Sequence, residues 1–359
     1  MKVLIVSDMQ HMGGTEVATL ITAKSLKQAN INVTVLGKYG PLCEEIKKNH
    51  IEYINIDTHP IGIFNHLKLF IFFIKIFKKD YTIVHAQMAR PIPLIWLACK
   101  VIRSNIKVFW TSRGLKSETY KYIGKIFPLM SIKGIGNCKS EQDKLIKYGF
   151  LKENTGYAYN PYRLEVTSEY NSFSSKKIKI GMLTSLRKGR NVTLFFNVAK
   201  QLVDIYGTEN IEFIIAGDGD NRRNYENLVV KMGIEKNCLF LGNVTNIEEY
   251  FENLDIFVSA LTVKGDRGAG VSNAIVEAML MRTPVCAFDA AAIGEIVINN
   301  QTGYLVESGN VDAMIEAIKN IVDDKNKTEQ YVENAYNLIL RECDPEKYAQ
   351  RLISLYKEL

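Results

Sequence analysis

Two adjacent glycines near the start of the chain are the first residues that could contact a ligand. Gly13 and Gly14 lie in the segment HMGGTE, between a short apolar run and a stretch with helical periodicity. Glycine lets the backbone approach a ligand closely, and the first turn of a helix offers free N–H groups and the positive end of its dipole. The segment predicts a site for a phosphate or a negatively charged transition state. A tight turn without a ligand is the alternative.

A basic loop occurs in the second half of the chain. The segment TSLRKGRN, residues 184–191, carries Arg187, Lys188 and Arg190 directly after an apolar run. A guanidinium can bind a diphosphate through two parallel hydrogen bonds. Ligands of parallel sheets bind beyond the carboxyl ends of the strands. We therefore interpret this loop as a diphosphate site, with a solvated basic loop as the alternative.

The segment AGDGD, residues 216–220, combines glycines with two carboxylates. Gly217 and Gly219 predict a close turn after a strand. Asp218 and Asp220 could instead form the metal-binding Asp-x-Asp pair of single-domain sugar transferases. Those transferases have a single α/β domain, whereas the pattern of strands and helices described below predicts two in this chain. We therefore predict that no metal is bound.

The segment GAGVSNAIVEAMLMRTPVCAF, residues 268–288, is the most informative. A glycine-rich loop enters a helix that Ser272 or Asn273 would cap. Glu277 follows among apolar residues and could accept hydrogen bonds from ribose hydroxyls. The alternative is a glutamate that only stabilises the helix dipole, an effect of about 0.3–1 kcal/mol.

The elements that position these residues alternate between strands and helices along the whole chain. Short apolar runs predict buried parallel strands, and the segments between them have helical periodicity. In the first half we expect strands at 3–7, 32–36, 51–56, 81–86, 107–111, 133–137 and 155–159, and helices at 15–29, 41–49, 61–78 and 91–103.

The alternation restarts after a polar, serine-rich stretch at 166–177, which we interpret as a linker. We expect strands at 178–184, 211–216, 238–242, 255–259 and 284–288, helices at 192–206, 221–233 and 272–282, and a helical tail from 309. The sequence thus predicts an α/β protein with two doubly wound parallel sheets in tandem and a cleft between two domains.

Composition excludes several classes of protein. The chain has 359 residues and a formal net charge of +6, which suits anionic small ligands or an anionic membrane surface and is too small to indicate nucleic acid. Its six cysteines are far apart and form no metal-binding motif. The N-terminal apolar run is too short for a signal peptide. A cytoplasmic protein is the simplest interpretation.

One apolar stretch permits two interpretations. The segment IGIFNHLKLFIFFIKIF, residues 61–77, is interrupted by polar residues and is followed by Lys78 and Lys79. A membrane-spanning helix needs about 20 apolar residues, so this segment predicts either a helix that lies on a membrane surface or a buried crossover helix.

Taken together, these motifs resemble those of the retaining glycosyltransferases of family four, within the glycosyl transferases group 1. The resemblance covers almost the whole chain and depends on the order and spacing of its motifs. Besides the segments above, these are IVHAQ at 83–87, TSRG at 111–114, YNP at 159–161, FLGNV at 240–244, LDIFVSA at 254–260, GVSNAIVEAM at 270–279 and GEIVINNQTGYLV at 294–306.

The resemblance implies the GT-B fold of two Rossmann-like domains. An acceptor-side domain would span 1–165, a nucleotide-sugar domain 166–340, and a final helix at 341–359 would cross back to the first domain. It also implies that the donor is a UDP- or GDP-sugar and that neither a metal nor another cofactor is needed.

Positions of the family's motifs imply roles for individual residues. Gly13 and Gly14 would abut the donor phosphates, and Arg190 matches a phosphate-binding lysine. Leu241 and Gly242 would lie by the nucleobase. Glu277 matches the second glutamate of a Glu-x7-Glu signature, the one that binds ribose. The full predicted donor site is Gly13, Gly14, Arg187, Arg190, Gly217, Leu241, Gly242, Ser272, Asn273 and Glu277.

The chain departs from the family at the positions that would face the transferred sugar. The first glutamate of the signature is replaced by Ala269, and the usual active-site histidine by Arg113. His85 remains from a His-x-His pair whose second member is Gln87. We predict His85 and Arg113 as catalytic residues, and expect Ala269 to change sugar choice, with Asp266 as a possible substitute.

The predicted function is transfer of a hexose or N-acetylhexosamine to a hydroxyl, with retention of configuration. The acceptor would be a glycan or lipid-linked glycan in bacterial surface polysaccharide assembly, with peripheral contact at the inner face of the plasma membrane. The alternative is a catalytically silent subunit of the same fold that binds nucleotide or partners an active transferase. Another enzyme on this fold, an epimerase or a phosphorylase, would need acid pairs or a cofactor lysine that we do not find.

Overall fold

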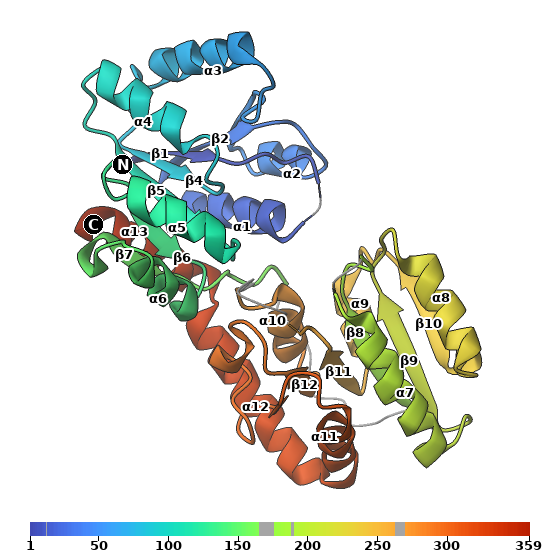
Figure 1. Cartoon of the computed structure of the whole chain (residues 1–359). Helices are drawn as coiled ribbons and strands as arrows, with labels where there is room; N and C mark the ends of the chain where they lie inside the picture. Colours follow the sequence, from blue (N-terminus) through green and yellow to red (C-terminus); the bar gives the residue numbers. More distant parts are fainter. Residues whose placement is uncertain (12, 165–175, 188–189, 263–269) are drawn as a thin grey trace. The chain divides into compact units, whose positions relative to one another are not determined.

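The chain folds into two compact units. The computed structural model describes residues 1–11, 13–164, 176–187, 190–262 and 270–359. Unit 1 is formed mainly by Met1–Arg163 and Glu342–Leu359, and unit 2 by the described residues of Leu164–Arg267 and Val271–Arg341 (Figure 1). The predicted linker at 166–177 and the positions Lys188, Asp266 and Ala269 lie wholly or largely outside the described residues.

Unit 1 is built on a seven-stranded sheet with the order β3-β2-β1-β4-β5-β6-β7, in which every neighbouring pair is parallel. Because the order reverses between β1 and β4, the loops after these two strands diverge at the carboxyl edge, which is where open α/β sheets bind ligands. The strands are β1 Lys2–Val6, β2 Asn32–Gly37, β3 Glu52–Asn55, β4 Ile83–Ala86, β5 Lys107–Ser112, β6 Lys133–Gly136 and β7 Thr155–Tyr157.

Helices cover both faces of this sheet. Successive strand residues point to opposite faces, so Leu4 and Val6 belong to one apolar core while Val3 and Ile5 belong to another. Helices α3 Ile63–Ile76, α4 Ile92–Val101 and α5 Ser117–Ile126 complete the first core, and α1 Gly14–Gln28, α2 Cys43–Lys48 and α13 Pro345–Glu358 the second; α6 Lys139–Lys147 and the 3-10 turn Lys152–Asn154 precede β7.

The final helix, α13, is part of unit 1. Asp344 caps it by accepting a hydrogen bond from the backbone N–H of Lys347, and Pro345 occupies its first turn, where a missing N–H does no harm. The face that includes Tyr348 and Leu352 lies in the core against α1. The Tyr348 hydroxyl is 2.9 Å from the Thr22 hydroxyl of α1.

Unit 2 repeats the architecture with a six-stranded parallel sheet of order β10-β9-β8-β11-β12-β13. Here the order reverses between β8 and β11. The strands are β8 Ile178–Leu183, β9 Ile211–Ala216, β10 Cys238–Gly242, β11 Ile256–Ser259, β12 Val285–Phe288 and β13 Tyr304–Val306. The helices are α7 Val192–Tyr206, α8 Arg222–Lys231, α9 Ile247–Glu252, α10 Asn273–Leu280, α11 Val311–Asp323 and α12 Lys325–Glu342, with 3-10 turns at Glu235–Asn237 and Ile293–Glu295.

The doubly wound sheet predicted for each half is confirmed. One strand was not predicted: β13 has only three residues, Tyr304–Val306, and follows a turn. Three residues are too few for a periodic signal, so its pairing with β12 is visible only in the folded sheet. Within the described residues, no helix has both the length and the apolar character needed to cross a bilayer.

We expect Leu352→Ala to lower the free energy of unfolding of unit 1 by about 2–5 kcal/mol, because it opens a cavity in a fully buried position. Both tryptophans, Trp96 and Trp110, lie in unit 1, so their fluorescence during urea unfolding reports on this unit. The exposed neighbour provides the control: Gln350→Ala is expected to change stability by less than about 0.5 kcal/mol. Equal effects of the two substitutions would contradict the burial of α13.

Candidate functional site

Three loops at the carboxyl edge of the unit 2 sheet form one continuous surface. The backbone N–H of Leu186 donates to Asp218 O at 3.0 Å, and that of Asn221 donates to Leu186 O at 2.9 Å. The N–H of Gly217 donates to Gly242 O at 2.7 Å. The loops after β8, β9 and β10 are therefore held together by hydrogen bonds between their backbones.

Glycine is required where these loops meet. Gly217 has a φ of +118°, and a Cβ at this position would lie 1.9 Å from the carbonyl oxygen of Thr184. A Cβ at Gly219 would lie 2.7 Å from the carbonyl group of Leu186. The close turn predicted from AGDGD is present, and its cause is the neighbouring loop after β8.

The basic residues of the loop after β8 are available to an anion. Arg187 and Arg190 are exposed, and the only bond that joins them is between the Arg190 N–H and Arg187 O, at 3.3 Å. Neither guanidinium has an ion-pair partner among the residues that the structure describes. Leu241, on β10, is 45% exposed and could contact a flat apolar ring.

Glu277 is a buried carboxylate on α10. Its exposed fraction is only 5%, and its neighbours Ile275, Val276 and Ala278 are buried as well. It is the fifth residue of the helix, beyond the first turn, where the dipole effect has faded. Burial of a carboxylate is costly unless it receives hydrogen bonds, so a dipole effect alone does not explain this residue.

The start of α10 differs in one detail from the prediction. Ser272 stands at the N-cap position and Asn273 is the first helical residue, but the Ser272 side chain makes no capping hydrogen bond. The Ser272 hydroxyl therefore does not bond to the first backbone N–H groups of α10. These N–H groups could donate to an anionic or hydroxyl-bearing ligand.

The predicted donor residues of unit 2 flank the point where the strand order reverses. The basic loop leaves β8, and α10 follows β11, the neighbour of β8 on the other side of the reversal. Open parallel sheets bind ligands at this point. The positively charged loop thus follows β8, on one side of the switch point. Glu277 lies on the helix that follows β11, on the other side.

The metal alternative has little support in this loop. The Asp218 carboxylate accepts the N–H of Gly219 at 2.7 Å and lies 3.6 Å from the Arg222 guanidinium, while Asp220 is exposed. Over the described ranges, no group of three or more His, Cys, Asp or Glu residues is placed to hold a metal ion.

In unit 1, helix α1 begins at the predicted glycine pair. Gly13 is the N-cap in an extended conformation, Gly14 is the first helical residue, and no side chain caps the helix. The carboxylate of Glu16 lies beside Gly13, since a Cβ at Gly13 would be 2.8 Å from it. Met12 lies outside the described residues.

Arg113 is a largely buried cation beyond the end of β5. Its two terminal nitrogens donate to Asn160 Oδ1 and Gln87 Oε1, both at 2.6 Å. Its Nε is buried and has no acceptor among the described residues. Burial lowers the pKa of the Arg113 guanidinium. The hydrogen-bond partners are neutral amides, and the charge of Glu16 acts on the guanidinium in the direction opposite to burial. A cation with no carboxylate bonded to it is suited to an anionic ligand.

His85, which we predicted to be catalytic, lies below the surface on β4. Its Nδ1 is 2.6 Å from the Tyr356 hydroxyl and its Nε2 2.6 Å from the Thr111 hydroxyl. Burial, together with the positive charge of Arg113, lowers the pKa of His85 to about 3. The neutral ring also lies 3.4 Å from the Gln87 amide. In this geometry His85 contacts Gln87, which in turn accepts a hydrogen bond from Arg113.

Another polar group at the same edge of unit 1 was missed by the sequence analysis. The Asp8 carboxylate, after β1, and the His59 imidazole, after β3, are joined by a hydrogen bond. They are 51 positions apart. The sequence signal that could have revealed this pair is that each residue closely follows a strand. Parallel strands bring such residues to the same, carboxyl edge of the sheet.

Comparison with solved structures defines the class of protein. HepE of Anabaena, solved in complex with UDP and glucose, superposes over 100% of both chains with a TM-score of 0.84 at 18% identity. A glycosyltransferase from Rickettsia africae superposes with a TM-score of 0.84 at 19% identity over 99% of this chain and 98% of its own. Two parallel-sheet α/β units arranged in this chain order define the GT-B fold.

The family follows from the sequence of unit 2. Residues 166–338 match the family model described as glycosyl transferases group 1, so this part of the chain is a domain of that family and the protein is a glycosyltransferase. The capsular polysaccharide biosynthesis glycosyltransferase CapM of Staphylococcus aureus is 21% identical over 356 residues, which cover 92% of this chain and 91% of CapM. These findings confirm the resemblance seen in the sequence and are consistent with family four.

The low pKa of His85 generates a prediction about stability. The folded-state pKa of about 3 is below the unfolded value of 6.5, so the folded state resists protonation. The contribution of neutral His85 is fully present above pH 6.5 and is lost as the pH falls toward 3. Linkage gives a loss of about 2 kcal/mol between pH 7 and pH 5.

His85→Gln is expected to remove this contribution, so the free energy of unfolding of unit 1 should fall less between pH 7 and pH 5 than in the unchanged protein. Urea unfolding followed by tryptophan fluorescence measures the difference. His66→Gln, at an exposed histidine of α3, is the matched control and should keep the original pH dependence. Identical pH dependence of both variants would show that His85 titrates normally.

Proposed function

We propose that the protein is a retaining glycosyltransferase that moves a hexose or N-acetylhexosamine from a UDP- or GDP-sugar to a hydroxyl. The acceptor oxygen forms a bond to the anomeric carbon while the bond from that carbon to the diphosphate breaks. The nucleoside diphosphate leaves with the electron pair, and the hydroxyl proton is released. The new bond has the configuration of the old one.

One observation carries the proposal. Within a glycosyl transferases group 1 domain, two unpaired arginines and the helix that carries a buried glutamate flank the switch point of a parallel sheet. Arg187 and Arg190 supply charge for a diphosphate, and Glu277 supplies acceptors for ribose hydroxyls. Gly217 and Gly242 let the backbone approach the nucleotide, with Leu241 beside its base. Ser272 and Asn273 supply donors at the start of α10.

Unit 1 supplies a further cation, Arg113. Arg113 is buried, its Nε has no acceptor in the part of the chain that the structure describes, and its two partners are neutral amides. We propose that it binds an anionic group of the substrates, together with the N–H groups at the start of α1 beyond Gly13 and Gly14. His85 holds Gln87, and through it Arg113, in place.

We further propose that transfer needs no metal. The negative charge of a leaving diphosphate can be stabilised by a metal ion or by fixed cations. Arg187 and Arg190 provide the cations. The Asp218 carboxylate accepts a backbone N–H and lies near Arg222, which leaves it poorly placed to bind a metal.

The acceptor is proposed from the relatives. CapM is a capsular polysaccharide biosynthesis glycosyltransferase. A Campylobacter jejuni relative, 21% identical over 93% of this chain and 92% of its own, is an N-acetyl-D-galactosaminyltransferase whose name gives a PP-undecaprenol-linked glycan as acceptor. We propose a glycan or lipid-linked glycan of bacterial surface polysaccharide assembly, used at the inner face of the plasma membrane.

Helix α3 has a surface suited to that location. Leu69, Phe73 and Ile76 are buried against the sheet, so α3 is a crossover helix along one stripe. Several other apolar residues of the helix are exposed: the exposed fraction is 78% for Phe64 and 53% for Leu67. We call the exposed residues Ile61, Ile63, Phe64, Leu67 and Ile71 the α3 face. The exposed Lys68, Lys75, Lys78 and Lys79 adjoin it and would attract anionic lipid.

The donor site is tested with a panel of UDP- and GDP-sugars, first by thermal shift and then by release of nucleoside diphosphate. We expect one nucleotide to bind and its sugar to be transferred. Glu277→Gln should weaken nucleotide binding about 10- to 100-fold in calorimetry, as expected for lost hydrogen bonds to a charged group. Glu252→Gln, at an exposed glutamate of the same unit, is the control and should bind normally.

Three outcomes are decisive. Normal affinity of the Glu277→Gln protein would remove Glu277 from the site. Binding without release or transfer, with every donor and acceptor tried, would favour a catalytically silent subunit. Turnover that is abolished by chelators and restored by a divalent cation would contradict metal independence.

Membrane contact is tested with the substitution of Phe64 and Leu67 by serine. The unchanged protein should sediment with vesicles of anionic phospholipid at low salt, and the double variant should remain in the supernatant because the inserted apolar area is lost. Val230→Ser, at a residue of unit 2 that is 60% exposed, is the control and should sediment normally. Failure of the unchanged protein to sediment would contradict the membrane proposal.

A further inference from the structure

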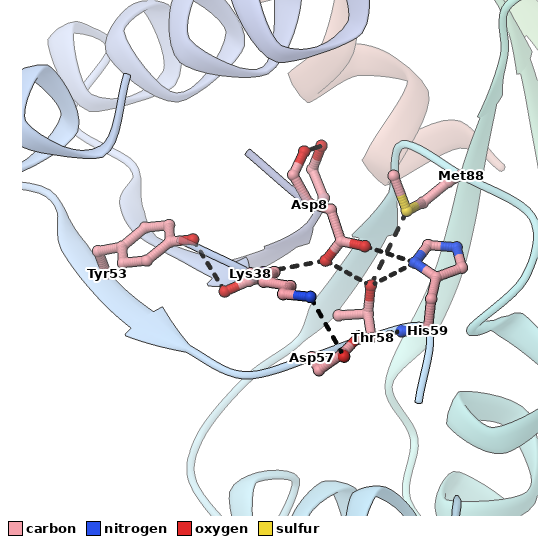
Figure 2. A network of polar contacts seen from close by, with 9 residues as sticks. Asp8, Lys38, Tyr53, Asp57, Thr58, His59 and Met88 are labelled. Atoms are coloured by element: carbon pink, nitrogen blue, oxygen red, sulfur yellow. Dashed lines mark hydrogen bonds and ion pairs between the residues drawn. The ribbon is translucent and has the colours of Figure 1, made fainter. Parts of the chain in front are cut away.

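The Asp8–His59 pair is the strongest feature of unit 1 that the proposed donor chemistry does not use. His59 Nδ1 donates a hydrogen bond to Asp8 Oδ2 (Figure 2). The Thr58 hydroxyl donates to Asp8 Oδ1 at 2.8 Å, and the backbone N–H of Lys38 donates to the same oxygen at 2.9 Å. Both carboxylate oxygens of Asp8 therefore have partners, and the carboxylate is fixed in orientation.

The loop that carries Asp8 is in close backbone contact with the loop after β2. A Cβ at Gly37 would lie 1.8 Å from the carbonyl oxygen of Ser7, and a Cβ at Gly40 would lie 1.6 Å from that of Met9. Within the loop after β3, the Asp57 carboxylate accepts the backbone N–H of His59 at 2.8 Å. The backbone at His59 is thus fixed within its own loop, and the imidazole is held by Asp8 and Thr58.

Only half of the hydrogen-bonding capacity of His59 is used. Its Nδ1 faces Asp8 and Thr58, whereas its Nε2 has no partner among the described residues and points away from the network in Figure 2. The side chain is 22% exposed. Because Nδ1–H is committed to a carboxylate, Nε2 is the ring nitrogen that is left for a ligand.

We propose that His59 is an acceptor-binding residue: its Nε2 accepts a hydrogen bond from a hydroxyl of the acceptor sugar, and Asp8 is the positioning residue that holds the tautomer. This inference rests on the proposed glycosyl transfer and adds a named contact for the acceptor. Asp8, Thr58 and Met88 follow β1, β3 and β4, so the pair lies at the carboxyl edge beside the switch point of the unit 1 sheet.

A purely structural role explains these observations less well. If the Asp8–His59 pair served only to connect loops, full burial would make its hydrogen bond more stabilising. The bonds from Thr58 and Lys38 to Asp8 already connect the neighbouring loops to the loop after β1. A second nitrogen that is exposed, oriented and unused is what a hydroxyl-binding site needs. Sites built to bind a substrate hydroxyl discriminate strongly, because an unpaired polar group is costly.

The test compares variants in the transfer assay with octyl glycosides of glucose, galactose, N-acetylglucosamine and N-acetylgalactosamine as acceptors, and with the nucleotide sugar that the unchanged protein hydrolyses. His59→Ala should raise the acceptor KM about tenfold and leave the KM for the nucleotide sugar and its hydrolysis by water unchanged. Asp8→Asn should have a similar effect, since an asparagine N–H would favour the other tautomer. His59→Gln should restore part of the acceptor affinity.

Controls separate this inference from the proposed function. His66→Ala, at an exposed histidine of the same unit, should leave the acceptor KM unchanged. Tryptophan fluorescence during unfolding verifies that each variant retains unit 1. An unchanged acceptor KM in the His59→Ala protein, or an equal loss in donor hydrolysis, would overturn the role of His59 while leaving glycosyl transfer intact. A protein that transfers to none of the four acceptors would overturn the proposed acceptor chemistry and this inference together.

Discussion

Close contact between neighbouring loops at the carboxyl edges of the two sheets is the constraint on which the sites depend. Parallel strands lie about 4.8 Å apart, so the loops that leave the same edge compete for space. At Gly217 and Gly37 the next loop is so near that a Cβ would lie 1.9 Å and 1.8 Å from a carbonyl oxygen. Because the backbones touch there, polar side chains beside these contacts keep their orientation without a ligand.

The same edge in unit 1 is connected to the core by a chain of polar contacts. Tyr356 of α13 bonds to His85, His85 lies beside Gln87, and Gln87 accepts from Arg113. The last helix of the chain thereby contributes to the orientation of the Arg113 guanidinium, which follows β5. His85 remains neutral at physiological pH, so it adds no repulsion to the buried guanidinium.

Helix α3 illustrates how a crossover helix can have two roles. A helix on a sheet buries about one stripe of its surface, and in α3 that stripe includes Leu69 and Phe73. The α3 face is left exposed by the described residues of unit 1, with an exposed fraction of 78% for Phe64. The interpretation as a buried crossover helix is therefore right for one stripe, and the membrane-surface interpretation stays a prediction. A large exposed apolar face indicates an interaction surface.

The sequence by itself determined the two doubly wound sheets and the places where residues with useful chemistry leave them. Periodicity and glycine spacing are local properties, so the strands, the loop at Gly217, the basic loop at Arg190 and the helix of Glu277 were predictable. The three-residue strand β13 was too short for such a signal. Tertiary structure alone decided that both nitrogens of His85 are occupied, that Arg113 has only amide partners, and that Asp8 meets His59. Burial and hydrogen-bond partners depend on which strands become neighbours, and that order is set by packing between residues far apart in the chain.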